Sequence, residues 1–230
     1  MGYPSLRRTI EIANEYVNSG CDTIEIDLPA KDPYMENELI SSRMESALNH
    51  EPSYDQYLET LSAIRKNHPD TAFIVLVYER TIKEIGPDKF VDFLKKEDAL
   101  DVIYVGSEFP EIRKKLMNNG VRISSFVPFD LDREHVEVAK STNGFVYMQA
   151  KSTGDVNPDY PTLRSCINYL REEAKIRRPI YAGVGIRDES DISTVKEAGA
   201  DGAFVGSTVL KLHNDIPKLK QTIKKLKSNT

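Results

Sequence analysis

The chain has 230 residues, 40% of them apolar, and a formal net charge of −5 from 31 basic and 36 acidic side chains. A chain of this length can build one sizeable core, and α/β barrels of this size commonly form one domain, so we expect a single domain over residues 1–230. The basic residues form no stripe that could follow a phosphate backbone, which argues against nucleic acid as a partner.

No segment has the pattern of a membrane span or a signal peptide. The longest apolar runs, such as FIVLVY at 73–78, are far shorter than the roughly 20 residues that a spanning helix needs. We therefore expect a cytoplasmic protein without a membrane partner. The two cysteines, Cys21 and Cys166, and the four histidines show no metal-ligand spacing, so neither a disulfide framework nor a metal site is predicted.

Helical and strand patterns alternate along the chain. Apolar residues recur at helical spacing from Leu6 to Val17, with Ser5 as a helix N-cap and Gly20 as a stop signal. Segments rich in β-branched and aromatic residues then predict strands at 21–28, 72–78, 100–107, 121–129, 144–150, 179–184 and 202–207. Between and after them we predict helices at 54–67, 87–96, 111–118, 133–140, 161–176, 189–198 and 216–227.

This alternation predicts parallel strands connected by crossover helices, and it favours a (β/α)₈ TIM barrel. Only seven strands are visible, because a helix follows directly after MGYP. We expect that an upstream segment is missing from the given sequence, or that the sheet is open or is completed by another chain. An open barrel leaves two strand edges unpaired, so we expect the chain alone to be poorly stable.

Two acidic side chains share one face of the first predicted strand. Side chains alternate along a strand, so Glu25 and Asp27 point one way and the apolar residues around them point the other way. In a barrel the acidic face points inward near the C-terminal mouth, where active sites lie. Two carboxylates roughly 6.6 Å apart raise the pKa of one of them, which suits general acid–base catalysis. Alternatively, one acid pairs with Lys31 and the other caps a loop.

Glycine follows two of the late strands, in AGVGIRDESD at 182–191 and in GAFVGSTVL at 202–210. Glycine allows close approach of the backbone, and amides at a helix N-terminus bind anions, so two adjacent loops of this kind predict a phosphate site. Barrels often have such a site after their last two strands. Gly183-Val184-Gly185 alone is a weak signal, but Gly206-Ser207 at the next strand end strengthens it. A third loop, KSTGD at 151–155, is placed to close over the same ligand.

These motifs resemble the α subunit of tryptophan synthase, a (β/α)₈ barrel that cleaves indole-3-glycerol phosphate to indole and glyceraldehyde 3-phosphate. The likeness covers residues 2 to about 212. It runs through GYPSLRRTIEIANEYVNSGCDTIEIDLPAKDP at 2–33, VLVYE at 75–79, YMQA followed by TG, and GVGI followed by GADGAFVGS.

The resemblance implies roles for individual residues. Glu25 matches the catalytic glutamate that transfers protons during carbon–carbon cleavage, and Glu36 falls where the family has an aspartate that assists at the indole nitrogen. The remaining matches are substrate-binding positions: Tyr78 and Tyr147 for the indole ring, Gly185, Gly206 and Ser207 for the phosphate with Gly154 joining them from a mobile loop, and Thr153, which helps close that loop over the acid of the second loop.

The chain also departs from the family pattern. Asp27 stands where the family has glycine, Glu36 is one methylene longer than the aspartate, and a shift of about 1 Å can cost on the order of a hundredfold in rate. The loop after the strand at 144–150 is about two residues shorter, with Lys151 in place of arginine. We expect Asp27 to raise the pKa of Glu25, unless it forms a salt bridge with Lys31.

The resemblance therefore implies a carbon–carbon lyase of tryptophan biosynthesis that works with a β subunit. The β subunit would carry pyridoxal phosphate, and this chain would need no cofactor. Two alternatives stay open: a divergent barrel lyase or isomerase acting on another phosphorylated substrate, and a catalytically weak α-like protein that binds and activates a β subunit.

Overall fold

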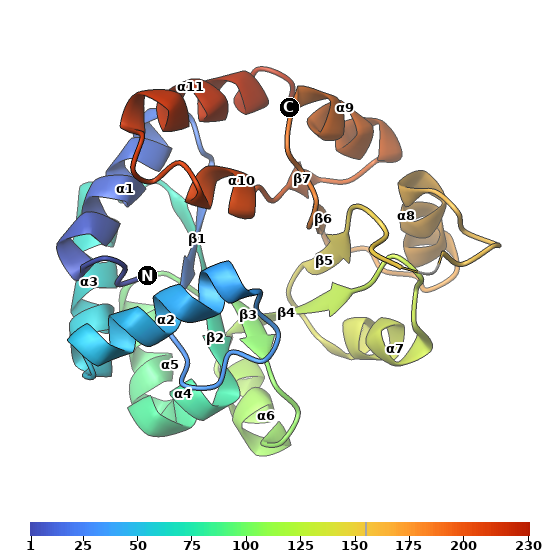
Figure 1. Ribbon diagram of the computed structural model, residues 1–230. Coiled ribbons are helices and arrows are strands. Elements are labelled where there is room, and N and C mark those ends of the chain that lie inside the picture. The colour runs from blue at the N-terminus through green and yellow to red at the C-terminus, as the bar shows by residue number, and fades with distance from the viewer. Residues whose placement is uncertain (155) are drawn as a thin grey trace. The chain divides into compact units, whose positions relative to one another are not determined.

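The computed structural model describes residues 1–154 and 156–230, and it has the alternating helices and parallel strands that the sequence predicts (Figure 1). All seven predicted strands are present. The chain divides into two compact units, Met1–Ile123 and Ser124–Thr230, and each has its own hydrophobic cluster.

In the first unit three strands pair in parallel in the order β1-β2-β3. The register sets Glu25 of β1 opposite Ile74 of β2. The elements are α1 (Leu6–Asn18), β1 (Thr23–Asp27), α2 (Glu38–His50), α3 (Tyr54–Asn67), β2 (Ala72–Tyr78), α4 (Glu79–Ile85), α5 (Pro87–Lys96), β3 (Asp101–Val105) and α6 (Pro110–Asn118).

The core of this unit fixes which face of β1 is apolar. Ile24 and Ile26 are almost fully buried in the same cluster as Leu61 and Ile64 of α3. Because side chains alternate along a strand, Glu25 and Asp27 must occupy the opposite face. The predicted alternation along β1 is confirmed.

Four parallel strands pair in the order β4-β5-β6-β7 and lie in the second unit, except that the first two residues of β4 belong to the first unit. Each strand leads through a loop into a helix, so the carboxyl ends of neighbouring strands carry neighbouring loops. The elements are β4 (Arg122–Val127), α7 (Arg133–Ser141), β5 (Val146–Gln149), α8 (Leu163–Glu172), β6 (Ile180–Gly183), α9 (Glu189–Ala198), β7 (Gly202–Ala203), α10 (Ser207–Leu210) and α11 (Ile216–Lys227).

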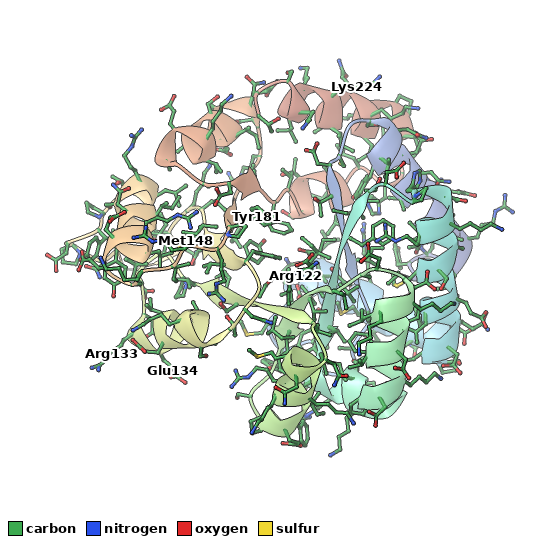
Figure 2. The ribbon with its side chains drawn as sticks, turned by 180° about the vertical axis from the view of Figure 1, so that it is seen from behind. Arg122, Arg133, Glu134, Met148, Tyr181 and Lys224 are labelled. Atoms are coloured by element: carbon green, nitrogen blue, oxygen red, sulfur yellow. The ribbon has the colours of Figure 1, made fainter. Side chains whose placement is uncertain are left out.

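Figure 2 shows the contrast between core and surface in this unit. Met148 of β5 is fully buried, whereas Arg133 and Glu134 at the start of α7 and Lys224 on α11 are exposed. Within the described residues, none of the helices combines the length and the apolar character that crossing a membrane requires.

Three helices were not predicted. In α2, which Asn37 caps by accepting a hydrogen bond from the Ile40 amide, only Met44 and Ala47 are buried, so its apolar stripe is too narrow to detect. The helices α4 and α10 have 7 and 4 residues, which is too short for a helical period to show. Several predicted ends were also wrong: α8 stops at Glu172 and β7 contains only Gly202 and Ala203.

The assignment of residues 1–230 to one domain stays a prediction, and one core variant in each unit tests it. Ile64→Ala in α3 and Ile167→Ala in α8 each remove buried methyl groups, which lowers the free energy of unfolding by roughly 2–5 kcal/mol. We expect both variants to shift the same single transition in urea unfolding followed by circular dichroism. Two transitions, each shifted by only one variant, would contradict the prediction.

Candidate active site

Strand β1 holds Glu25 and Asp27 on the face opposite its buried isoleucines. Among the described residues, Glu25 Oε2 is buried without a hydrogen-bond partner. Burial, followed by the neighbouring Asp27 carboxylate and then Glu36, raises the pKa of Glu25 well above its usual value. Of the two acids on β1, Glu25 is therefore the group that binds a proton more readily than usual.

Asp27 shares that proton. Burial also raises the pKa of Asp27, but the hydrogen bond between the two carboxyl groups raises the pKa of Glu25 and lowers that of Asp27. Protonation of the pair is therefore favoured at Glu25 and the negative charge at Asp27, because two adjacent charges in a desolvated place are unfavourable.

The alternative pairing of an acid on β1 with Lys31 is wrong. The Lys31 ammonium instead binds Glu84 of α4, with 2.6 Å between Nζ and Oε2, at an exposed position. The Asp27 backbone carbonyl accepts a hydrogen bond from the Met1 amino group at 2.8 Å.

Glu36 lies on the loop after β1 and is tied to the end of β2. The Tyr78 hydroxyl donates to Glu36 Oε1 at 3.4 Å and accepts from the Met35 amide at 3.3 Å. Burial, and then the negative charge of Asp27, raises the pKa of Glu36 to about 7. The structure thus brings Glu25, Glu36 and Tyr78 together, as the sequence predicts, and adds Asp27 to them.

Exposed ion pairs hold the same loop against α4. Lys31 binds Glu84, and Asp32 lies 3.5 Å from the Arg80 guanidinium, which also binds Glu108 at 2.6 Å. Each exposed pair contributes little free energy alone, at most about 1 kcal/mol. Together they restrict the directions in which the loop that carries Glu36 can move.

A buried carboxylate that the sequence analysis missed fixes the next loop. Glu79, only 4% exposed, accepts hydrogen bonds from the Tyr104 hydroxyl at 2.8 Å and from the Glu108 and Phe109 amides at 2.7 and 3.2 Å. Gly106, at φ +138°, leaves room for it, since a Cβ there would lie 2.2 Å from Glu79 Cδ. The sequence signal that could have identified Glu79 is the position of an acidic residue directly after a buried strand.

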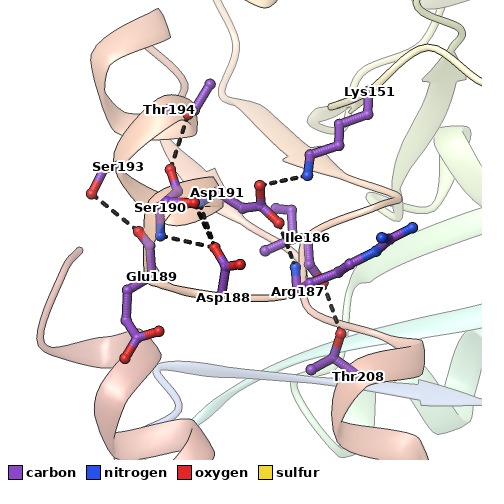
Figure 3. A network of polar contacts seen from close by, with 10 residues as sticks. All are labelled: Lys151, Ile186, Arg187, Asp188, Glu189, Ser190, Asp191, Ser193, Thr194 and Thr208. Atoms are coloured by element: carbon purple, nitrogen blue, oxygen red, sulfur yellow. Dashed lines mark hydrogen bonds and ion pairs between the residues drawn. The ribbon is translucent and has the colours of Figure 1, made fainter.

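In the second unit, the loops after β6 and β7 lie side by side. The Thr208 hydroxyl donates to the Ile186 carbonyl at 2.9 Å (Figure 3), and the Phe204 amide donates to the Ala182 carbonyl at 2.8 Å. These bonds join the two glycine-containing loops that the sequence assigns to phosphate binding.

The backbone of these loops presents unused donors. Within the described residues, the amides of Val184, Gly185 and Gly206 donate no hydrogen bond, and Ser207 begins α10. Val184 has φ +66°, an unusual conformation for a β-branched residue, and its side chain is 41% exposed. Such local strain is typical of ligand-binding loops. The arrangement forms a cradle of amides suited to an anion.

The loop at 151–154 is anchored by Gln149, another buried residue that the sequence analysis missed. The Gln149 side-chain amide donates to the Lys151 carbonyl at 2.8 Å and to the Thr153 hydroxyl at 3.2 Å, and its Oε1 accepts from the Phe129 amide at 3.1 Å. Closure of Thr153 over the acid of the loop after β1 stays a prediction, and Asp155 of the predicted KSTGD loop lies outside the described residues.

Tyr147 of β5 lies in an aromatic cluster next to Gly183. Its ring centroid is 4.8 Å from that of Phe204 and 5.8 Å from that of Phe126. A Cβ at Gly183 would lie 2.4 Å from the Tyr147 ring, so only glycine fits there. The ring is half-buried, and its assignment to indole binding stays a prediction.

The predicted site residues thus fall into two groups. The first unit holds Glu25, Glu36 and Tyr78, and the second holds Tyr147, Thr153, Gly154, Gly185, Gly206 and Ser207. In the part of the chain that the structure describes, no group of three or more histidine, cysteine, aspartate or glutamate side chains is arranged to hold a metal ion.

A parallel α/β fold with functional groups on the loops at the carboxyl ends of its strands is typical of an α/β enzyme, and an amide cradle of this kind suits a phosphorylated ligand. The family model "Tryptophan synthase alpha chain" matches residues 1–230. The chain belongs to this family.

Curated relatives agree with this membership. The chain is 25% identical to the tryptophan synthase alpha chain of Buchnera aphidicola over 234 residues, which cover 99% of this chain and 86% of the relative. It is 25% identical to that of Staphylococcus carnosus over 200 residues, which cover 84% and 79%.

Two solved structures show the same fold. A protein of Aquifex aeolicus aligns with a TM-score of 0.86 at 23% identity, covering 99% of this chain and 89% of the other. A chain of the tryptophan synthase of Mycobacterium tuberculosis aligns with a TM-score of 0.82 at 22% identity, covering 100% and 89%. The predicted fold class, α/β of the TIM-barrel type, is confirmed.

The raised pKa of Glu36 predicts a stability that depends on pH. Its folded pKa of about 7 exceeds its ordinary value of 4.5, so the folded chain binds more protons between these values, and the free energy of unfolding falls as pH rises through this range. Glu36→Gln removes the ionisable group and therefore this decrease in the free energy of unfolding. We expect the variant to be more stable than the parent at pH 8, by on the order of 1 kcal/mol after solvent screening, and equally stable at pH 4.5.

Urea unfolding at pH 4.5 and pH 8 measures the difference. Glu45→Gln, at an exposed position of α2, is the matched control and is expected to follow the parent at both pH values. An equal difference between Glu36→Gln and the parent at both pH values would show that burial does not disfavour the charged form of Glu36.

Proposed function

We propose that this chain cleaves indole-3-glycerol phosphate to indole and glyceraldehyde 3-phosphate as the α component of tryptophan synthase. Membership of the family supports a carbon–carbon lyase of tryptophan biosynthesis. The observation that carries the mechanism is the proton held on Glu25 by burial and by Asp27.

Carbon–carbon cleavage of this substrate needs a proton on the indole ring carbon and the loss of a proton from the neighbouring hydroxyl. Protonated Glu25 donates to the ring carbon. The carbon–carbon bond then breaks, its electron pair restores the aromatic ring, and the hydroxyl becomes the aldehyde as it returns a proton to Glu25. The Glu25 carboxyl group is therefore protonated again at the end of the reaction. A carboxyl group with a raised pKa suits both the donation and the return of the proton.

Glu36 and Tyr78 serve the indole end of the substrate. A carboxylate at Glu36 accepts a hydrogen bond from the indole N–H, and the Tyr78 hydroxyl bound to Glu36 Oε1 restricts the position of that carboxylate. Because the pKa of Glu36 is about 7, a considerable fraction of the group is ionised at neutral pH.

The cradle serves the phosphate end. The amides of Gly185, Gly206 and Ser207 donate to the phosphate oxygens, and Gly154 joins them from the loop at 151–154. This role in phosphate binding is supported by the amides of the two linked loops that donate no hydrogen bond to the described residues. Amides fixed in this way hold an anion without reorganisation.

The family implies a β-subunit partner, and one of the related structures is a tryptophan synthase. We propose further that the β subunit carries the pyridoxal phosphate, that this chain uses no cofactor of its own, and that both work in the cytoplasm.

The departures at Asp27 and Glu36 favour one further candidate, a lyase or isomerase that acts on a different phosphorylated substrate. The cradle would be kept and the acid cluster would serve other chemistry. Binding of glycerol 3-phosphate without release of indole would support this second candidate.

The variant Glu25→Gln tests the proposed lyase. The amide cannot transfer the proton, so we expect the rate of indole release from indole-3-glycerol phosphate to fall at least about a hundredfold, with or without a β subunit. Glu45→Gln is the control and keeps the parent rate. Full activity of Glu25→Gln would contradict the mechanism, and activation of a β subunit by a chain that releases no indole would support the α-like activator instead.

The variant Asp27→Asn tests the proton-sharing pair. Removal of the negative neighbour lowers the pKa of Glu25, so Glu25 loses its proton at a lower pH. We expect the alkaline fall of kcat/KM for indole release to begin at a lower pH than in the parent. A pH profile that matches the parent would show that Asp27 does not hold the proton on Glu25.

A further inference from the structure

Lys151 follows β5 and is restrained at its backbone, its stem and its ammonium group. Its carbonyl accepts from the Gln149 side chain at 2.8 Å, and its ammonium lies 2.5 Å from Asp191 Oδ1 (Figure 3). Its stem crosses Gly185, where a Cβ would lie 3.2 Å from Lys151 Cδ. A long side chain on an exposed loop ordinarily samples many rotamers, so this degree of restraint requires an explanation.

Asp191, in the first turn of α9, is itself held firmly. The residue is 9% exposed, and its Oδ2 accepts from the Arg187 amide at 2.8 Å. Its own amide donates to Asp188 Oδ1, the N-cap of the helix, at 3.1 Å. Asp191 therefore presents one oxygen in a fixed position, and that oxygen binds Lys151.

The ion pair leaves binding capacity on the lysine side. An ammonium group has three donors, and the described residues supply it with one acceptor, Asp191. Both oxygens of Asp191 are already engaged, by Lys151 and by Arg187. An anion that reaches the loop after β6 therefore meets donors on Lys151 that the described residues leave unused.

We propose that Lys151 is the cation that binds the phosphate monoester at the cradle, and that Asp191 is the residue that positions it above Gly185. The inference rests on the proposed phosphate site and adds to it a side-chain charge that the amides lack. Asp191 also limits the net charge of the site, because without a ligand the lysine charge is already balanced.

A solvated ion pair with no role in binding is the competing explanation. Such a pair contributes little to stability and needs no support from other elements. Here, however, glycine at 185 makes room for the lysine stem, and Gln149 fixes the backbone from which the side chain starts. Both features place the ammonium at the loop whose amides are unused.

Calorimetric titration of the full chain with glycerol 3-phosphate tests the inference. Loss of a charged hydrogen bond predicts that Lys151→Met weakens binding about tenfold and makes it less sensitive to salt, because one fewer charge pair is screened. Lys151→Arg keeps the charge and is expected to bind within about threefold of the parent. Lys196→Met, which removes an exposed lysine from the same helix as Asp191, is the control and binds like the parent.

A double-mutant cycle tests the positioning role of Asp191. In the Lys151→Met background, Asp191→Asn removes an unbalanced negative charge and tightens binding of glycerol 3-phosphate. In the parent, the same change also frees the ammonium from its anchor, so the gain is smaller or becomes a loss. We expect the two effects to differ by at least about threefold. Additive effects would show that Asp191 does not act through Lys151.

The outcomes separate this inference from the proposed function. If Lys151→Met binds glycerol 3-phosphate as tightly as the parent and with the same salt dependence, the role of Lys151 is overturned, but the amide cradle is not. A folded parent that binds no glycerol 3-phosphate overturns the phosphate site and the inference together. Rescue by Lys151→Arg alongside loss in Lys151→Met supports both.

Discussion

The chemistry of this chain depends on the placement of two carboxyl groups on one face of β1. Packing of the isoleucines of that strand against the helices leaves Glu25 and Asp27 no other side to occupy. Two adjacent charges cannot both persist where water is scarce, so the pair retains a proton. Burial, and then the negative charge of Asp27, likewise raises the pKa of Glu36. The carboxyl pair thus retains a proton because side chains alternate along β1 and the other face of this strand packs in the apolar core.

Both units fix their loops by the same device, a buried polar side chain at the carboxyl end of a strand. In the first unit Glu79, directly after β2, accepts from the two amides of the loop after β3. In the second unit Gln149, the last residue of β5, binds the backbone of the loops on either side of it, at Phe129 and at Lys151. A buried hydrogen bond to a loop contributes more order than an exposed ion pair, because removal of one partner leaves the other unsatisfied.

The sequence predicted the features that are local in the chain. The alternation of acidic and apolar residues in β1 and the paired glycine loops follow from periods of two residues and from strand–turn–helix order, and the structure confirms the placement of both. Contacts between distant positions were out of reach. One alternative predicted from the sequence pairs Lys31 with an acid on β1 four or six residues away, but Lys31 binds Glu84, 53 residues further along. The role of Gln149 as a loop anchor likewise depends on Phe129, which only the pairing of β4 with β5 brings near.

The backbone at Val184 has a consequence for the evolution of heat resistance. A β-branched side chain at φ +66° costs free energy that glycine would not, and the exposed side chain recovers little of it by packing. Selection for thermal tolerance alone would therefore replace this valine with glycine. The same replacement would let the 184–185 segment sample many more conformations and scatter the direction of its amides. Thermal stability and anion binding thus favour different residues at position 184. The residue that homologues from hot environments have there would show which of the two properties selection has favoured.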